Sequence, residues 1–186
     1  ITEKIGEYKM ETLTIENVKD KIRAVPDFPK KGIIFRDITT GLKDAQTLQV
    51  MIDYLCEQYK DCEIDYIAGI ESRGFIFGMP MAYKMNCGFI PVRKPNKLPA
   101  ETIKESYDLE YGSDSIEIHA DAVEKGAKVL VVDDLLATGG TAKAACNLVR
   151  KAGGELVGAA FLIELKGLNG VEKLADCGKV VSMLQY

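Results

Sequence analysis

Short, strongly apolar runs separated by amphipathic segments are the feature that most limits the folds open to this sequence. The runs are DYIAGI (65–70), GFIPV (88–92), KVLVVDD (128–134) and ELVGAAFLIEL (155–165). Runs this apolar suit strands covered on both faces, and strands that alternate with helices form a parallel sheet. The sequence therefore predicts an α/β fold whose central, mostly parallel sheet is flanked by helices.

Amphipathic segments supply the predicted helices. Thr14 and Asp44 stand as caps before apolar residues at helical spacing, and Pro26 would stop the first segment. Between DYIAGI and the apolar stretch that follows it lies the turn ESRG (71–74). Helices are predicted over residues 14–25, 44–59, 75–85 and 141–151.

The segment between residues 101 and 120 has a different pattern. SIEIHA (115–120) alternates apolar and polar residues, which is typical of a half-exposed edge strand or hairpin arm. The polar stretch before it, 101–113, has no period that would bury one face, so it is expected to be a flexible loop. No long linker divides the chain, and 1–186 is predicted to form one domain.

Composition excludes several classes of protein. With 186 residues, of which 47% are hydrophobic, the chain is large enough to bury a core. A net charge of −4 argues against a surface that binds nucleic acid or anionic lipid. No run approaches the roughly 18 apolar residues of a membrane span, and the first residues lack a signal peptide's apolar run.

The cysteines and the histidine narrow the chemistry further. Five scattered cysteines with no CxxC spacing predict neither disulfides nor zinc, so a reducing cytoplasm is expected. Cys146 lies among small apolar residues and is interpreted as buried. The one histidine, His119, lies in the alternating segment and makes a Ser-His-Asp hydrolase improbable.

The strongest functional signal is the stretch VLVVDDLLATGGT (129–141). In open α/β sheets the ligand sits at the carboxyl ends of the strands, where Asp133 and Asp134 are predicted to lie. The small residues Thr138 to Thr141 would let backbone N–H groups converge at the start of a helix, which favours a phosphate. Two nearby carboxylates would repel a bare phosphate but accept hydroxyl donors, so a ribose 5-phosphate fits this polarity.

Two further groups of cations follow predicted strands. Arg73 lies in the ESRG turn, and Arg93, Lys94 and Lys97 follow GFIPV. Either group could be a solvated loop, or could supply counter-ions for an anionic leaving group. Phe35, in GIIFRD (32–37), could be a core residue or a stacking surface.

Several motifs in one order resemble the type I phosphoribosyltransferases, in particular those that act on adenine. The matching segments are PDFPKKGIIFRDIT (26–39), DYIAGIESRGFIFG (65–78), VRKPNKLP (92–99), YDLEYG (107–112), VVDDLLATGGTAKAAC (131–146) and the terminal LQY. The resemblance implies a type I phosphoribosyltransferase fold with a small hood over about 11–40 and a flexible catalytic loop. It also implies a homodimer that needs Mg²⁺ and transfers phosphoribosyl from 5-phosphoribosyl 1-pyrophosphate to adenine, giving AMP and pyrophosphate.

The resemblance also implies roles for individual residues. Glu71 stands where relatives often have Asp, in a loop that often contains a cis peptide. Glu110 would be an acid or base and Tyr111 would help close the loop, while Arg73, Asp133 and Asp134 complete the catalytic set. Ribose 5-phosphate would be held by Asp133, Asp134, Ala137, Thr138, Gly139, Gly140 and Thr141, with Mg²⁺ held mainly through substrate and possibly by Asp133 and Asp134. Pyrophosphate would be held by Glu71, Ser72, Arg73, Arg93, Lys94 and Lys97, and adenine by Ile34, Phe35, Arg36, Leu135 and Leu165.

Two alternatives remain open at this point. Enzymes for 6-oxopurines are expected to use a lysine near the strand after the phosphate helix, and Lys166 follows Leu165 directly. Strand alternation would turn Lys166 away from a pocket that Leu165 faces, which favours adenine. A regulator on the same fold that binds DNA is disfavoured by the acidic balance and the absence of a basic helix-turn-helix segment.

Overall fold

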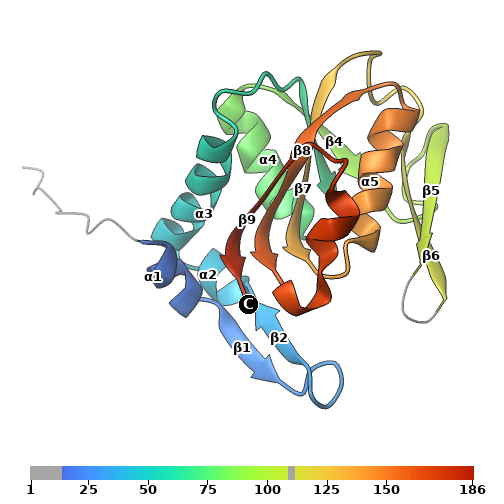
Figure 1. Ribbon diagram of the computed structural model, residues 1–186. Helices are drawn as coiled ribbons and strands as arrows, with labels where there is room; N and C mark the ends of the chain where they lie inside the picture. Colours follow the sequence, from blue (N-terminus) through green and yellow to red (C-terminus); the bar gives the residue numbers. More distant parts are fainter. Residues whose placement is uncertain (1–13, 109–111) are drawn as a thin grey trace, which may run out of the picture. The chain divides into compact units, whose positions relative to one another are not determined.

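The computed structural model describes residues 14–108 and 112–186 (Figure 1), and its chain divides into an N-terminal unit, 1–50, and a C-terminal unit, 51–186. The N-terminal unit contains helix α1 (Ile15–Asp20), the antiparallel strands β1 (Arg23–Pro26) and β2 (Ile34–Asp37), and the short helix α2 (Thr39–Leu42). It also contains the start of helix α3 (Ala45–Gln58), which continues into the C-terminal unit.

The first predicted helix is correct at its start and wrong at its end. The Thr14 side chain accepts a hydrogen bond from the Asn17 N–H and so caps α1. The helix ends at Asp20 instead of Val25, because Arg23–Pro26 pairs with β2 and Arg23 forms an ion pair with Asp37. The predicted cap of α3 is confirmed, since Asp44 Oδ1 accepts the Thr47 N–H at 2.9 Å.

A five-stranded parallel sheet forms the centre of the C-terminal unit (Figure 1). Its order is β4-β3-β7-β8-β9, and all four apolar runs are confirmed as strands. The fifth strand, β9, was not predicted. The five strands of this sheet are β3 (Tyr66–Ile70), β4 (Gly88–Val92), β7 (Lys128–Leu136), β8 (Glu155–Glu164) and β9 (Lys179–Gln185).

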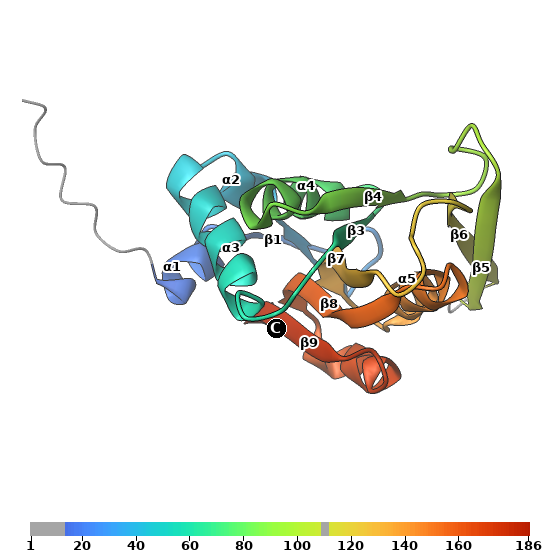
Figure 2. The same cartoon turned by 90° about the horizontal axis from the view of Figure 1, so that it is seen from above.

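Helices α4 (Gly74–Met85) and α5 (Gly140–Lys151) cover opposite faces of this sheet (Figure 2). Val129 and Val131 of β7 belong to the core that α5 covers, where Cys146 is fully buried as predicted. The intervening residues of β7, Leu130 and Val132, are equally buried on the other face, and α4 packs against β3, β4 and β7. Burial on both faces explains why these strands are apolar at every position, and the predicted α/β fold is confirmed.

An antiparallel hairpin of β5 (Thr102–Asp108) and β6 (Ser113–His119) corrects two expectations. Residues 101–113 were expected to lack regular structure, but most of this stretch is strand, because β5 pairs along β6 and packs on α5. Strand β6 was expected to be half-exposed, yet Ser115 to Ile118 are all buried. Glu117 is buried because its backbone pairs with Arg93 and its carboxylate accepts the Asn96 N–H at 3.3 Å.

The connection between β8 and β9 contains two short 3₁₀ helices, η1 (Lys166–Leu168) and η2 (Gly170–Leu174). Within the described part of the chain, no helix is long and apolar enough to cross a membrane.

Candidate active site

The two aspartates of the central strand lie at the wall of a cavity. Strand β7 runs two residues past the predicted end, so Asp133 and Asp134 are still within the sheet, and Asp133 is opposite Phe161 of β8. Asp133 Oδ1 accepts the Asp134 N–H at 2.8 Å. The cavity has a volume of about 490 Å³ and is lined by Ile70, Glu71, Ser72, Arg73, Lys94, Asp133, Asp134 and Thr141.

The surroundings of both aspartates raise the pKa of their side chains above the ordinary value. Loss of hydration raises the pKa of Asp133 well above its ordinary value, and the adjacent charge of Asp134 raises it further. Burial also raises the pKa of Asp134, although Arg73 opposes this shift. Arg73 Nε lies 2.9 Å from Asp134 Oδ2 in an ion pair. The cavity therefore places two adjacent aspartates beside Arg73, which is paired with one of them.

The loop after β7 has the geometry of an anion site. Gly139 has a left-handed φ of 79°, and α5 begins at the next residue. A second, smaller cavity of about 80 Å³ is lined by Asp133, Leu135, Leu136, Ala137, Thr138, Gly139, Gly140, Thr141 and Ala142. Thr141 and Asp133 line both cavities, so the helix N-terminus and the aspartates face adjoining spaces. Backbone N–H groups at a helix N-terminus favour negative charge.

The ESRG turn lies between β3 and α4. Its Glu71–Ser72 peptide is cis, the geometry that the family resemblance implied, and the Glu71 N–H donates to Val92 O at 2.8 Å. Gly74 allows α4 to start against β7, because a Cβ at this position would lie 2.6 Å from Val132 O. The turn is therefore held close to Asp133 and Asp134.

The three predicted cations after β4 lie in different places. Arg93 Nε donates to Glu71 Oε2 at 2.8 Å, and the hydrogen bond from Arg93 holds the pKa of Glu71 below its ordinary value. Lys97 is exposed and does not line the cavity, whereas Lys94 does. The Lys94 N–H also donates to Glu71 Oε2, at 2.8 Å.

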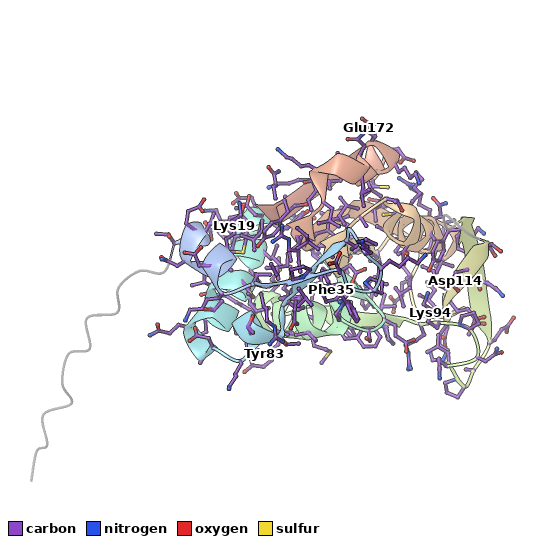
Figure 3. The ribbon with its side chains drawn as sticks, turned by 90° about the horizontal axis from the view of Figure 1, so that it is seen from below. Lys19, Phe35, Tyr83, Lys94, Asp114 and Glu172 are labelled. Carbon is purple, nitrogen blue, oxygen red and sulfur yellow. The ribbon has the colours of Figure 1, made fainter. Side chains whose placement is uncertain are left out.

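Two residues on the β5–β6 hairpin contact Lys94, and the sequence analysis missed both. Lys94 Nζ forms an ion pair with Asp114 and donates to the Tyr107 hydroxyl at 2.9 Å. Figure 3 labels Lys94 and Asp114, which lie beside each other at the hairpin. The partners lie 13 and 20 positions from Lys94. A search for opposite charges near the predicted cations would have found Asp114 only as one acid among many.

The residues predicted to bind adenine lie in two groups. Ile34, Phe35 and Arg36 are in β2 of the N-terminal unit, where Ile34 is exposed and the Phe35 ring meets Phe28 edge to face at 5.2 Å (Figure 3 labels Phe35). In the C-terminal unit, Leu135 lies in β7, and the Leu165 N–H donates to Leu136 O at 2.9 Å.

Two other predictions concern the ends of elements. Strand β8 stops at Glu164 and η1 begins at Lys166, so strand alternation does not reach Lys166 and that argument was wrong. Lys166 is exposed.

Glu110 and Tyr111, predicted to act in catalysis, lie outside the described residues.

Comparison with known proteins agrees with this arrangement. The family model for the phosphoribosyl transferase domain matches residues 40–183. Adenine phosphoribosyltransferase of Trichodesmium erythraeum is 59% identical over 169 residues, which cover 91% of this chain and 99% of that protein.

Solved structures agree as well. The adenine phosphoribosyltransferase of Thermoanaerobacter pseudethanolicus has a TM-score of 0.90 and 51% identity, covering 93% of this chain and 100% of that one. The enzyme of Saccharomyces cerevisiae, solved with an imino-altritol bisphosphate and adenine, has a TM-score of 0.86 and 40% identity, covering 91% and 98%. With the family model and these relatives each spanning most of its length, the chain belongs to the adenine phosphoribosyltransferase family of type I phosphoribosyltransferases.

Proposed function

We propose that this chain transfers the phosphoribosyl group from 5-phosphoribosyl 1-pyrophosphate to adenine, giving AMP and pyrophosphate in purine salvage. The observation that carries this proposal is one cavity in which two adjacent aspartates, a helix N-terminus and two cations meet. That combination suits a sugar with hydroxyls at its centre and phosphate groups at both ends.

The ribose 5-phosphate end is assigned to β7 and the loop after it. Backbone N–H groups from Ala137 to Thr141 receive the 5-phosphate, because these residues line the smaller cavity at the start of α5. Asp133 and Asp134 accept hydrogen bonds from the ribose hydroxyls. Arg73 keeps Asp134 paired while the sugar is absent.

The pyrophosphate end is assigned to the ESRG turn and Lys94. Ser72, Arg73 and Lys94 line the larger cavity and can bind the departing oxygens. Glu71 and Arg93 hold the turn in place, since the Glu71 carboxylate accepts hydrogen bonds from Arg93 Nε and from the Lys94 N–H. Lys97 adds positive charge from the surface. Displacement at the anomeric carbon passes through an oxocarbenium-like state, so stabilising the leaving group lowers the barrier.

The base is assigned to β2, Leu135 and Leu165. Phe35 stacks on the purine, and backbone groups of Ile34 and Arg36 read its edge. The yeast relative was solved with adenine, which supports this choice of base. By family resemblance, Glu110 exchanges a proton with adenine and Tyr111 helps to exclude water. These two assignments stay predictions.

The residues of the cavity fit a role for Mg²⁺ that depends on the substrate. The described residues contain no group of three or more histidine, cysteine, aspartate or glutamate side chains that could hold a metal ion. Glu71, Asp133 and Asp134 are the carboxylates among the residues that line the larger cavity. Mg²⁺ is commonly held by one or two carboxylates plus substrate phosphates. Bound with substrate, the ion would neutralise pyrophosphate charge.

We expect adenine to be the preferred base when each purine is supplied separately with Mg²⁺ and 5-phosphoribosyl 1-pyrophosphate. Mass spectrometry of the products should identify AMP, with adenine turning over at least about tenfold faster than hypoxanthine, guanine or xanthine. Faster turnover with a 6-oxopurine would contradict the assignment and point to Lys166. No nucleotide with any base, together with a salt-sensitive shift of DNA, would favour a regulator on this fold.

We also propose a homodimer in the cytoplasm. All five cysteines are free thiols, which suits a reducing compartment. Three apolar side chains on α4, Ile76, Met79 and Tyr83, lie at helical spacing and are exposed, Tyr83 by 91% (Figure 3 labels Tyr83). Such an apolar stripe on a helix suits the contact between two copies of a chain.

The dimer can be tested by sedimentation at assay concentration. Tyr83→Arg combined with Met79→Arg should shift the protein toward monomer, because each arginine would leave a charge in the contact. Ile15→Arg, which changes an exposed apolar residue on α1, is the matched control and should not shift it. A wild-type protein that sediments as a monomer would contradict the proposal.

A further inference from the structure

Gly170, at the start of η2, touches the backbone of the predicted phosphate loop. A Cβ built on Gly170 would lie 2.1 Å from Ala137 O and 3.0 Å from Gly139 N. The contact is reciprocal, since a Cβ on Gly139 would lie 2.5 Å from Gly170 O. The separations of 2.1 and 2.5 Å are far below the distance of about 3.5–4.0 Å at which carbon atoms make ordinary contacts. Two backbone segments therefore meet with no room for a side chain on either.

The atoms in this contact cannot move aside cheaply. They belong to main chain on both sides, so the adjustment that a flexible side chain allows is absent here. Gly139 N is itself one of the N–H groups at the start of α5. A methyl group at residue 170 would thus displace a donor of the phosphate site.

Segment η2 is anchored against α5 at its C-terminal end. Leu174 at its end is fully buried in the core that α5 covers. Asp176, two residues on, forms an ion pair with Lys143 of α5 and accepts from Arg150 Nη1 at 3.2 Å. A methyl group on Gly170 would therefore press on the loop backbone at Ala137 and Gly139, which lies within contact distance of it.

We infer that Gly170 is a positioning residue for the phosphate loop, setting by direct backbone contact where the N–H groups of 137–140 point. The inference rests on the proposed function, because it assumes that this loop binds the 5-phosphate. It assigns a role in substrate binding to a residue 30 positions or more from the loop along the chain.

Gly170→Ala tests this role, with Gly167→Ala as the matched control. Gly167 lies in the same connection, and a Cβ there meets nothing within 4 Å. Gly170→Ala should raise the KM for 5-phosphoribosyl 1-pyrophosphate by about 10- to 100-fold, since displacing a positioning group by an ångström can cost about this much. The KM for adenine should stay within about twofold, and Gly167→Ala should leave both constants within about twofold.

Equilibrium binding of ribose 5-phosphate, measured by calorimetry, gives a readout apart from turnover. Gly170→Ala should weaken it by a similar factor, because this ligand has neither base nor pyrophosphate. Wild-type protein that forms no AMP and binds no ribose 5-phosphate would overturn the proposed function. Wild-type protein that does both, with unchanged binding in folded Gly170→Ala, would overturn the inference alone.

A second variant carries the test if circular dichroism shows Gly170→Ala to be unfolded. Asp176→Ala adds no atoms and removes the side-chain ion pairs of Asp176, just after η2, with Lys143 and Arg150 of α5. It should raise the KM for 5-phosphoribosyl 1-pyrophosphate by about two- to fivefold with an unchanged KM for adenine, the size expected from losing exposed ion pairs. Equal KM values in Asp176→Ala and wild type would then overturn the inference.

Discussion

Replacing Asp134 with asparagine is expected to lower kcat/KM for 5-phosphoribosyl 1-pyrophosphate by about 10- to 150-fold, the equivalent of about 1.5–3 kcal/mol for a hydrogen bond to a charged group. Asp134 is almost fully buried and faces Arg73 across 2.9 Å. Asparagine keeps the shape of the side chain but removes the charge that holds Arg73 and that, in the proposed function, accepts the ribose hydroxyls. Steady-state kinetics with varied 5-phosphoribosyl 1-pyrophosphate measures the loss.

Asp53→Asn is the control for that experiment. Asp53 pairs with Lys84 on the surface, where the loss of one ion pair changes stability by at most about 1 kcal/mol. We expect it to keep wild-type kinetics. Near-normal activity in Asp134→Asn would mean that the carboxylate serves only the packing of β7 and takes no part in binding the sugar.

Asp133→Asn is expected to lose activity and gain stability at once. Burial raises the pKa of Asp133 in the folded protein above its value in the unfolded chain. The folded state then binds this proton more tightly, so the stability that the protonated carboxyl contributes is present at low pH and is lost as pH rises through the raised pKa. Asparagine cannot ionise, and its Oδ1 can still accept the Asp134 N–H.

The variant should therefore melt about 2–4 °C higher than wild type at pH 8, which corresponds to about 1 kcal/mol for a chain of this size. The difference should shrink as the pH falls toward 4. Thermal melts in EDTA, free of divalent cations, measure this, while kcat/KM for 5-phosphoribosyl 1-pyrophosphate should fall about 10-fold or more in the same protein. A lower melting temperature at pH 8 would show that the charge of Asp133 is well compensated in the fold.

Much of the fold was predictable because its signals are local. Val129 to Val132 are apolar without a break, and only a strand covered on both faces explains such a run in a chain that also contains amphipathic helices. The end of α1 was not predictable, because it depends on pairing between Arg23 and Asp37, which lie 14 positions apart. Strand β5 was missed for the same reason, since Glu105 is held by Asn147 and Lys151 of α5.

The candidate site divides in the same way. Asp133, Asp134 and the loop up to Thr141 are consecutive, so their chemistry could be recognised in one stretch of sequence. The contact between Gly170 and Gly139 could not, because it depends on where two backbones meet. The sequence also does not distinguish the roles of Arg93 and Lys94. In the structure the Arg93 side chain contacts Glu71, whereas the Lys94 side chain contacts the hairpin.

The pairing of Lys94 with Asp114 and Tyr107 has a consequence for the turnover cycle. A cation that already has partners contributes to ligand binding only the difference between its new and its old interactions. Under the proposed role of Lys94 in pyrophosphate binding, the ligand competes with Asp114 and Tyr107 for the lysine. The hairpin would then weaken the hold of Lys94 on the departing product, and so limit product inhibition by pyrophosphate.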